Sequence, residues 1–119
     1  AQRLVGAINT SAHEFDATFL HDGATVVFAR TQDFGAARVE VFVSSPQAGL
    51  YGAGTRLPTP ANNSVDDTYG AMLDWSGSGR ITLSARRDKE KGMDLYMVRY
   101  RLRGETPQPT VGPAQGRNP

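Results

Sequence analysis

Hydrophobic residues recur along this chain in short alternating runs, and these runs predict β-strands. In residues 38–44, RVEVFVS, valine stands at every second position, which is the period of a strand with one buried face. Similar runs, rich in Val, Ile, Phe and Tyr, occupy residues 25–29, 80–85 and 94–102, and clusters of Gly, Pro, Asn, Asp or Ser separate them. No window sustains the i, i+3, i+4, i+7 spacing of an amphipathic helix. The pattern predicts an all-β chain.

A tight turn is predicted inside residues 19–29, FLHDGATVVFA. Asp22 and Gly23 separate two apolar runs there, and they suit a turn because glycine accepts a positive φ and aspartate bonds the turn backbone. Residues 74–85, DWSGSGRITLSA, have a looser version of the same shape, with Ser76 and Gly77 in place of the Asp-Gly pair. We therefore expect two hairpins of one kind.

The two hairpins belong to a longer repeat. Residues 3–16 match residues 56–69, residues 17–23 match 71–77, residues 26–29 match 81–84, and residues 40–43 match 94–97. The paired positions at the start of the repeat are Arg3 and Arg56, Leu4 and Leu57, Asn9 and Asn62, and Glu14 and Asp67. The unit of about 53 to 55 residues occurs over residues 3–55 and 56–103, and each unit reads as a short strand, an Asn-led loop and three further strands. A four-stranded antiparallel unit that recurs at this length predicts a β-propeller blade, so residues 1–103 are expected to form two four-stranded antiparallel blades.

These residues resemble the TolB-like β-propeller repeats of bacterial envelope proteins, which are relatives of the WD-repeat propellers. The resemblance covers roughly residues 3–101. In the first unit it rests on Asn9, Thr10, Glu14, Asp22, Gly23 and Phe28, and in the second on Asn62, Asp67, Arg87, Gly92, Asp94, Leu95 and Tyr96. Tyr51 stands where the family commonly has Trp, His21 replaces a Pro, and the Ser76-Gly77 turn lacks the family's Asp.

The resemblance implies binding work without catalysis. Family propellers are chiefly protein-binding platforms, or non-catalytic domains joined to peptidases or to peptidoglycan-binding modules, and the resemblance carries over no catalytic residue. We therefore expect a non-catalytic scaffold that binds protein in the bacterial cell envelope, periplasmic or secreted. Two alternatives stay open: a lectin-like oligomeric propeller, for which Tyr51, Tyr69 and Trp75 are the candidate ligand contacts, and an accessory propeller piece of a peptidase. For Trp75 we expect packing between neighbouring blades.

Composition narrows the chemistry further. The chain has no cysteine, which removes disulfide frameworks, thiolate catalysis and thiolate zinc sites. Its net charge of +1 is too small for a general nucleic-acid binder, and no apolar run approaches the length that membrane insertion requires. The period-two run of Arg99, Arg101 and Arg103 is interpreted as protective charge on an edge strand.

Several polar clusters are interpreted as structural. His13, Glu14, Asp16, His21 and Asp22 have metal-ligating chemistry, but Glu14 and Asp22 suit loop and turn anchors, so no metal or cofactor is expected. Residues 88–94, DKEKGMD, are expected to be a solvated hairpin tip because lysines interrupt the acidic positions. Ser11, His13 and Asp16 lack a nucleophile elbow, so no hydrolase triad is expected.

Two blades do not close a propeller ring, which typically has four to eight. Either the remaining blades belong to a longer chain, or several copies assemble, three copies giving the six blades of TolB-like propellers. Arg56-Leu57 is expected to complete the first blade as its outermost strand, and Arg3-Leu4 to be a spare strand at the other end. Residues 104–119 are rich in Pro and Gly and are expected to form an irregular, extended tail.

Overall fold

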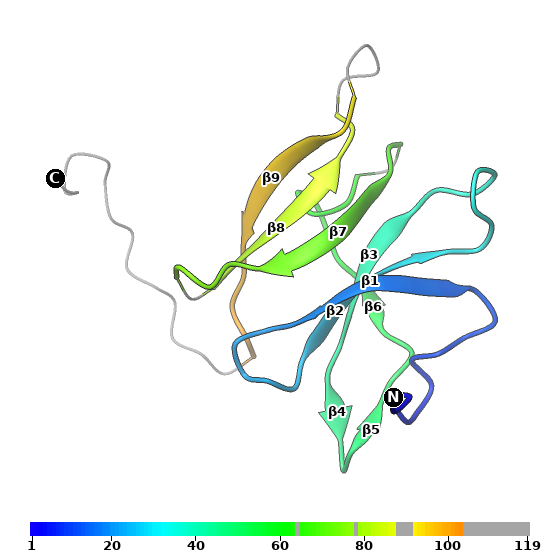
Figure 1. Cartoon of the computed structure of the whole chain (residues 1–119), viewed down its shortest axis with the longest axis vertical. Helices are drawn as coiled ribbons and strands as arrows, with labels where there is room; N and C mark the ends of the chain where they lie inside the picture. The colour runs from blue at the N-terminus through cyan, green and yellow to red at the C-terminus, as the bar shows by residue number, and fades with distance from the viewer. Residues whose placement is uncertain (64, 78, 88–91, 104–119) are drawn as a thin grey trace, which may run out of the picture.

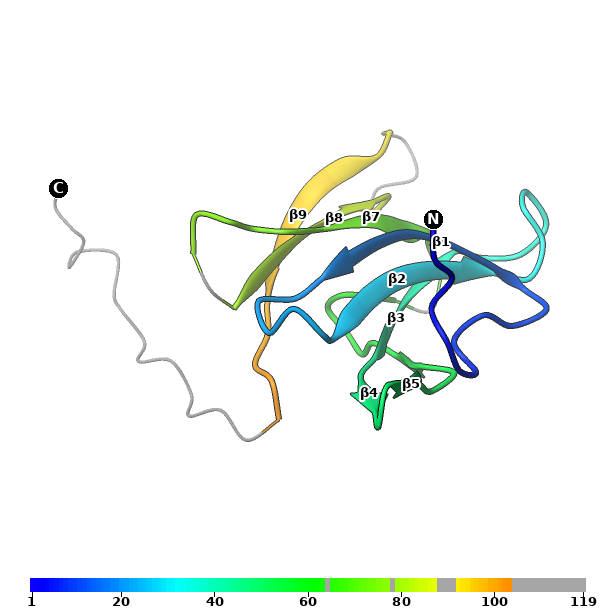
Figure 2. The same cartoon turned by 60° about the horizontal axis from the view of Figure 1, so that its bottom comes forward.

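The chain folds into antiparallel β-sheets in a computed structural model that describes residues 1–63, 65–77, 79–87 and 92–103. Within these residues there are nine strands and no helix, so the all-β prediction is confirmed (Figures 1 and 2). The strands are β1 (His13–Phe19), β2 (Val26–Thr31), β3 (Glu40–Ser44), β4 (Pro46–Gln47), β5 (Leu50–Tyr51), β6 (Thr55–Arg56), β7 (Thr68–Leu73), β8 (Arg80–Ala85) and β9 (Asp94–Arg99).

The first sheet has four strands in the order β1-β2-β3-β6. Strand β2 lies between β1 and β3 and is buried along most of its length, as its continuous apolar sequence requires. The short β6 pairs with β3, with Arg56 opposite Phe42 and Thr55 opposite Val43. Arg56 therefore lies on the outermost strand of this sheet, as the repeat predicts.

The second sheet differs from the prediction. It has three strands among the described residues, in the order β7-β8-β9, where a fourth was expected. Arg3 and Leu4 do not form a strand either; the neighbouring Gly6 instead makes an isolated parallel bridge with Tyr51. Tyr51 belongs to the small β4-β5 hairpin, which the sequence did not predict because two-residue strands carry no periodicity.

The two larger sheets have the same internal construction. The β1-β2 pairing shifts register between Phe15 and Thr18, and the β7-β8 pairing shifts between Tyr69 and Met72. A residue with positive φ lies inside each irregularity, Asp16 (50°) in the first and Gly70 (74°) in the second. The two β-bulges occupy matching places, so the register of the first sheet can be read directly onto the second.

This common register identifies which residues are equivalent. The hairpins close with Phe19 opposite Val26 in the first sheet and with Leu73 opposite Ile81 in the second. Counted along the ladder from these pairs, Val41 of β3 and Leu95 of β9 hold the same position, as do Glu40 and Asp94, Phe42 and Tyr96, and Val43 and Met97.

The main core lies between the two sheets. Val27, Val41 and Val43 of the first sheet face a cluster on the second sheet that includes Ile81 and Leu83. The opposite face of the first sheet carries a smaller cluster, Val26 and Phe28 with Phe42, covered by Leu4 and Ile8 of the N-terminal segment. Residues 57–61 cover the second sheet in the same manner, since Ala61 is buried in the main core as Ile8 is in the smaller one.

Candidate interaction surfaces

A buried asparagine joins the two units. Asn62 is 1% exposed, and its side chain bonds both backbone groups of Val41: the Oδ1 atom accepts the Val41 N–H at 2.9 Å, and Nδ2 donates to the Val41 carbonyl at 2.8 Å. Nδ2 also donates to the carbonyl of Leu57 at 2.7 Å, and the Leu57 N–H donates to the Val41 carbonyl at 3.0 Å. Asn62 therefore extends the edge of β3 as a side-chain substitute for backbone pairing.

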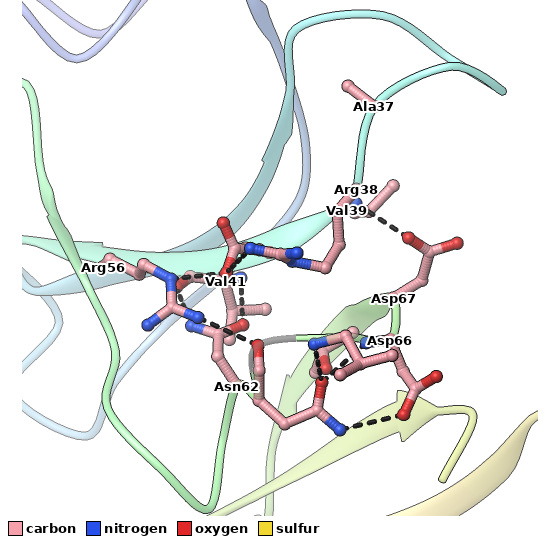
Figure 3. A network of polar contacts seen from close by, with 12 residues as sticks. Ala37, Arg38, Val39, Val41, Arg56, Asn62, Asp66 and Asp67 are labelled. Atoms are coloured by element: carbon pink, nitrogen blue, oxygen red, sulfur yellow. Dashed lines mark hydrogen bonds and ion pairs between the residues drawn. The ribbon is translucent and has the colours of Figure 1, made fainter. Parts of the chain in front are cut away.

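Charged groups lie on either side of this joint, as we call the contact of Asn62 with the backbone of Val41. Asp67 accepts the N–H of Val39 at 2.9 Å, which fixes the start of β7 to the residue before β3 (Figure 3). The guanidinium of Arg56 forms an ion pair with Glu40 and donates to the carbonyl of Asn63 at 2.9 Å. The loop that leads into the second sheet is thus held to the first sheet at three points: Arg56, Asn62 and Asp67.

The first unit repeats part of this arrangement. Asn9 Nδ2 donates to the carbonyl of Leu4 at 3.1 Å, as Asn62 does to Leu57 with the same spacing. Asn9 is only half-buried, and among the described residues its side chain makes this one hydrogen bond. The bonds that Asn62 makes to the neighbouring strand thus have no counterpart at Asn9 in this part of the chain.

Glu14 anchors the loop that follows Asn9. Its carboxylate accepts the Thr10 N–H at 3.1 Å and the Thr10 hydroxyl at 2.5 Å, and it forms an ion pair with Arg30 at 2.7 Å. Burial opposes the charged form, but the hydrogen bonds from Thr10 and Arg30 hold the pKa of Glu14 below its usual value. The register places Glu14 level with Thr68 and not with Asp67, because Glu14 pairs with Arg30 and Thr68 with Ala85.

The first hairpin turn uses Asp22 and Gly23. Gly23 has a φ of 68°, and its N–H donates to the carbonyl of Leu20 at 2.9 Å. The Asp22 carboxylate accepts the N–H groups of Ala24 and Thr25 at 2.9 and 2.8 Å, and the Thr25 hydroxyl at 2.6 Å. Although burial raises it, these hydrogen bonds lower the pKa of Asp22 overall.

The second hairpin corrects the sequence interpretation. The turn has not lost its aspartate, because Asp74, two residues before Ser76, accepts the Ser76 N–H at 2.9 Å. Hydrogen bonds from Ser76 lower the pKa of Asp74. Of the two glycines in the SGSG stretch expected to form this turn, Gly79 takes the left-handed conformation, with φ of 75°, and Gly77 does not. The sequence analysis missed this anchor; the signal that could have indicated it is the Asp-x-Ser spacing, which is common in side-chain turns.

The aromatic candidates for ligand binding lie apart. Tyr51 is half-buried and donates its hydroxyl to the carbonyl of Ala24 at 2.7 Å, while Tyr69 on β7 lies near Phe15 with ring centroids 6.4 Å apart. Trp75 is 87% exposed at the second hairpin tip. Among the described residues Trp75 therefore does not pack between the two sheets, and its packing against a further blade stays a prediction.

A groove runs between the two hairpin tips. It has a volume of about 380 Å³, and Trp75 forms part of its wall together with Phe19, His21 and Asp74. Tyr51 lines a separate hollow beside the β4-β5 hairpin. The groove thus offers a single exposed indole with one carboxylate and one imidazole nearby.

The outer face of the second sheet exposes apolar side chains on its two outer strands, β7 and β9. Met72, Leu95 and Met97 project from it, and Leu95 is 81% exposed, whereas the equivalent Val41 is 0% exposed beneath the second sheet. Tyr96, on the other side of β9, lies under the Arg87 guanidinium at 5.8 Å. Sequence analysis had placed Leu95 in a strand-like run and in a family motif, but residues 95–98, LYMV, are all apolar, so the pattern did not indicate which of them face outward.

The remaining candidates contribute no reactive site. Among the described residues no three His, Cys, Asp or Glu side chains gather to hold a metal ion. Gly92 and Asp94 are exposed where the chain enters β9, and Gly92 does not adopt a positive φ. Residues 88–91 of the expected hairpin tip and the expected tail, residues 104–119, lie outside the described residues. No helix in the described part of the chain is long and apolar enough to cross a membrane.

Comparison with protein-family models, with curated proteins and with solved structures found no match to this chain. The molecule itself offers two candidate surfaces. One is the apolar outer face of the second sheet, with Met72, Leu95 and Met97, and the other is the groove beside Trp75. The first has an internal counterpart that shows how such a face is covered, namely the joint at Val41 and Asn62.

Proposed function

We propose that this chain is a non-catalytic protein-binding module, two blades of a TolB-like β-propeller working in the bacterial envelope. The strand order β1-β2-β3-β6 supports the propeller assignment, because the chain leaves the outermost strand of one four-stranded sheet and enters the first strand of the next. The envelope location rests on the family resemblance described above.

One observation supports protein binding above all: Leu95 is 81% exposed at a position where the first sheet buries Val41 completely. Burying a leucine side chain stabilises a complex by roughly 1.5–3 kcal/mol. Met72 and Met97 are exposed on the same face, with Thr82 of β8 between them, and exposed apolar side chains gathered on one face are typical of interaction sites on soluble proteins.

The acidic side chains support a structural interpretation and not a catalytic one. Glu14, Asp22 and Asp74 each have a lowered pKa, and in each case the cause is a set of hydrogen bonds within a loop or a turn. Catalytic carboxylates that act as acids or bases need a pKa raised toward neutrality. The pKa values of these three carboxylates are lowered instead.

A photo-crosslinking experiment tests the proposal. A benzophenone amino acid is placed at position 95 and, as a control, at Phe34, which is also exposed and apolar but lies in the loop after β2. In cells that produce the protein we expect discrete protein adducts from position 95 and none from position 34. The absence of any protein adduct at position 95 would refute protein binding by this face.

The groove beside Trp75 favours a second candidate function, glycan binding. An exposed indole provides the flat apolar surface on which sugar rings stack, and Asp74 and His21 supply polar groups nearby. A glycan array with the parent and the W75A variant tests it. Saturable sugar binding that disappears in W75A supports a lectin, and a blank array with the folded parent excludes it for the sugars displayed.

A further inference from the structure

The two sheets have equivalent faces that are covered differently. On the first sheet, the face carrying Val41 and Val43 is packed against the second sheet. On the second sheet, the equivalent face carries Leu95 and Met97 and is exposed. The chain therefore contains both a covered and an uncovered version of one surface, and the covered version shows what fits it.

The first sheet also exposes a residue whose equivalent in the second sheet is buried. Leu73 of β7, at the end of the second sheet's first strand, is 5% exposed because it packs between the sheets. The equivalent Phe19 of β1, on the far side of the first sheet, is 47% exposed. The second sheet thus exposes the equivalents of the residues that the first sheet contributes to the contact between the sheets. The first sheet exposes Phe19, the equivalent of a residue that the second sheet contributes to that contact.

The edge strands show the same complementarity. Strand β3 is covered by β6, with the Leu57 N–H and the Asn62 carboxamide bonding the backbone of Val41. Strand β9 has no further strand along its edge among the described residues. The residues equivalent to Leu57 and Asn62 are Leu4 and Asn9, with the same spacing and the same internal bond.

The charged residues at the two ends of the molecule are complementary as well. In the joint, Arg56 pairs with Glu40. The equivalent residues are Arg3 and Asp94, which are both exposed, and neither forms an ion pair within the described residues. They cannot meet within one chain as it is folded, because the N-terminal segment lies beside β5 and β9 lies at the far edge of the other sheet (Figure 1).

From these equivalences we infer that a second copy of this chain binds the outer face and edge of β9, head to tail, through its residues 2–9. In this contact Gln2 and Arg3 of one copy run antiparallel along β9 of the other, opposite Met97 and Tyr96, as Thr55 and Arg56 run along β3. Arg3 pairs with Asp94.

The same contact gives the Asn9 carboxamide a partner in the neighbouring strand and covers the exposed ring of Phe19. The Asn9 carboxamide of one copy bonds the backbone of Leu95 in the other, as Asn62 bonds Val41. Phe19 of one copy covers the apolar face around Met97 of the other, in the place that Leu73 holds within the chain. The inference rests on the proposed function, since it names the partner of the face that function requires. An interface of this kind is heterologous, so further copies can add in the same direction.

Sedimentation velocity over a concentration series tests the inference through charge exchange. We expect the parent to self-associate. R3E and D94R should each weaken association about fivefold, and L95D about tenfold or more. The double variant R3E/D94R, and an equimolar mixture of the two single variants, should recover association. D33R makes the same charge change in the exposed loop after β2 and should match the parent.

The following outcomes overturn the inference. A parent that stays monomeric at all concentrations removes the second copy as partner. Self-association that is unchanged in L95D, or that the exchanged charges fail to restore, places the contact elsewhere. The crosslinking experiment distinguishes failure of the self-association inference from failure of the proposed function. Adducts at position 95 with other proteins only would overturn self-association and leave protein binding supported. The absence of any adduct would refute both proposals.

Discussion

Replacing Asn62 with alanine should destabilise the fold far more than the same change at Asn9. The two residues are equivalent in the repeat and make the same local bond, Asn9 to Leu4 and Asn62 to Leu57. Only Asn62 reaches a neighbouring strand, where it bonds the N–H and the carbonyl of Val41 in a fully buried place. The pair therefore isolates the contribution of the joint between the sheets.

The expected magnitude follows from the bonds that are lost. In N62A the buried Val41 N–H has no partner, which costs about 1–3 kcal/mol. The carbonyl of Leu57 loses its bond from Nδ2, which costs about 0.5–1.5 kcal/mol, while the carbonyl of Val41 retains the Leu57 N–H at 3.0 Å and loses less. We expect a total of about 3 kcal/mol for N62A and about 1 kcal/mol for N9A, which loses one half-buried bond.

Urea denaturation followed by circular dichroism measures both values. The experiment uses a dilute solution in which the chain is monomeric, so that contacts of Asn9 with a second copy do not contribute. Amide hydrogen exchange provides an independent measurement, because the Val41 amide should lose protection in N62A and keep it in N9A. Costs for the two variants that agree within about 0.5 kcal/mol would refute the role assigned to Asn62.

Two further predictions concern the first unit. G23V should lower the free energy of unfolding by more than about 1 kcal/mol, because Gly23 has φ of 68° and a side chain there meets no neighbouring atom, so that backbone strain alone acts. The control is G92V, at a position with no positive φ and with open space around it, and this variant should match the parent in the same thermal melt. Equal losses of stability in the two variants would contradict the turn assignment. Because hydrogen bonds from Thr10 and Arg30 lower the pKa of Glu14 in the folded chain, its contribution is complete above the unfolded pKa and is lost as pH falls through the folded pKa. The stability difference between the parent and E14Q should therefore shrink below about pH 4.3, and a difference that is constant or grows toward acid pH would contradict it.

Local patterns determined much of the secondary structure. Valine alternation placed β3, and the Asp22-Gly23 pair placed the first hairpin, because both depend on neighbouring residues only. The internal repeat located Asn9 and Asn62 as equivalent residues. A one-residue offset remained at Glu14, because the repeat matched it to Asp67, which precedes the first β7-β8 ladder pair, whereas the ladder places Glu14 level with Thr68.

Long-range contacts decided the rest. The sequence does not show that Asn62 reaches Val41, which lies 21 residues away. Leu95 and Val41 belong to the same repeat position and have similar side chains, yet one is exposed and the other is buried. The sequence by itself determined the longer strands, the first turn and the repeat. Only the tertiary structure decided which equivalent faces are covered, because burial depends on the neighbour that packs on a face and not on the face alone.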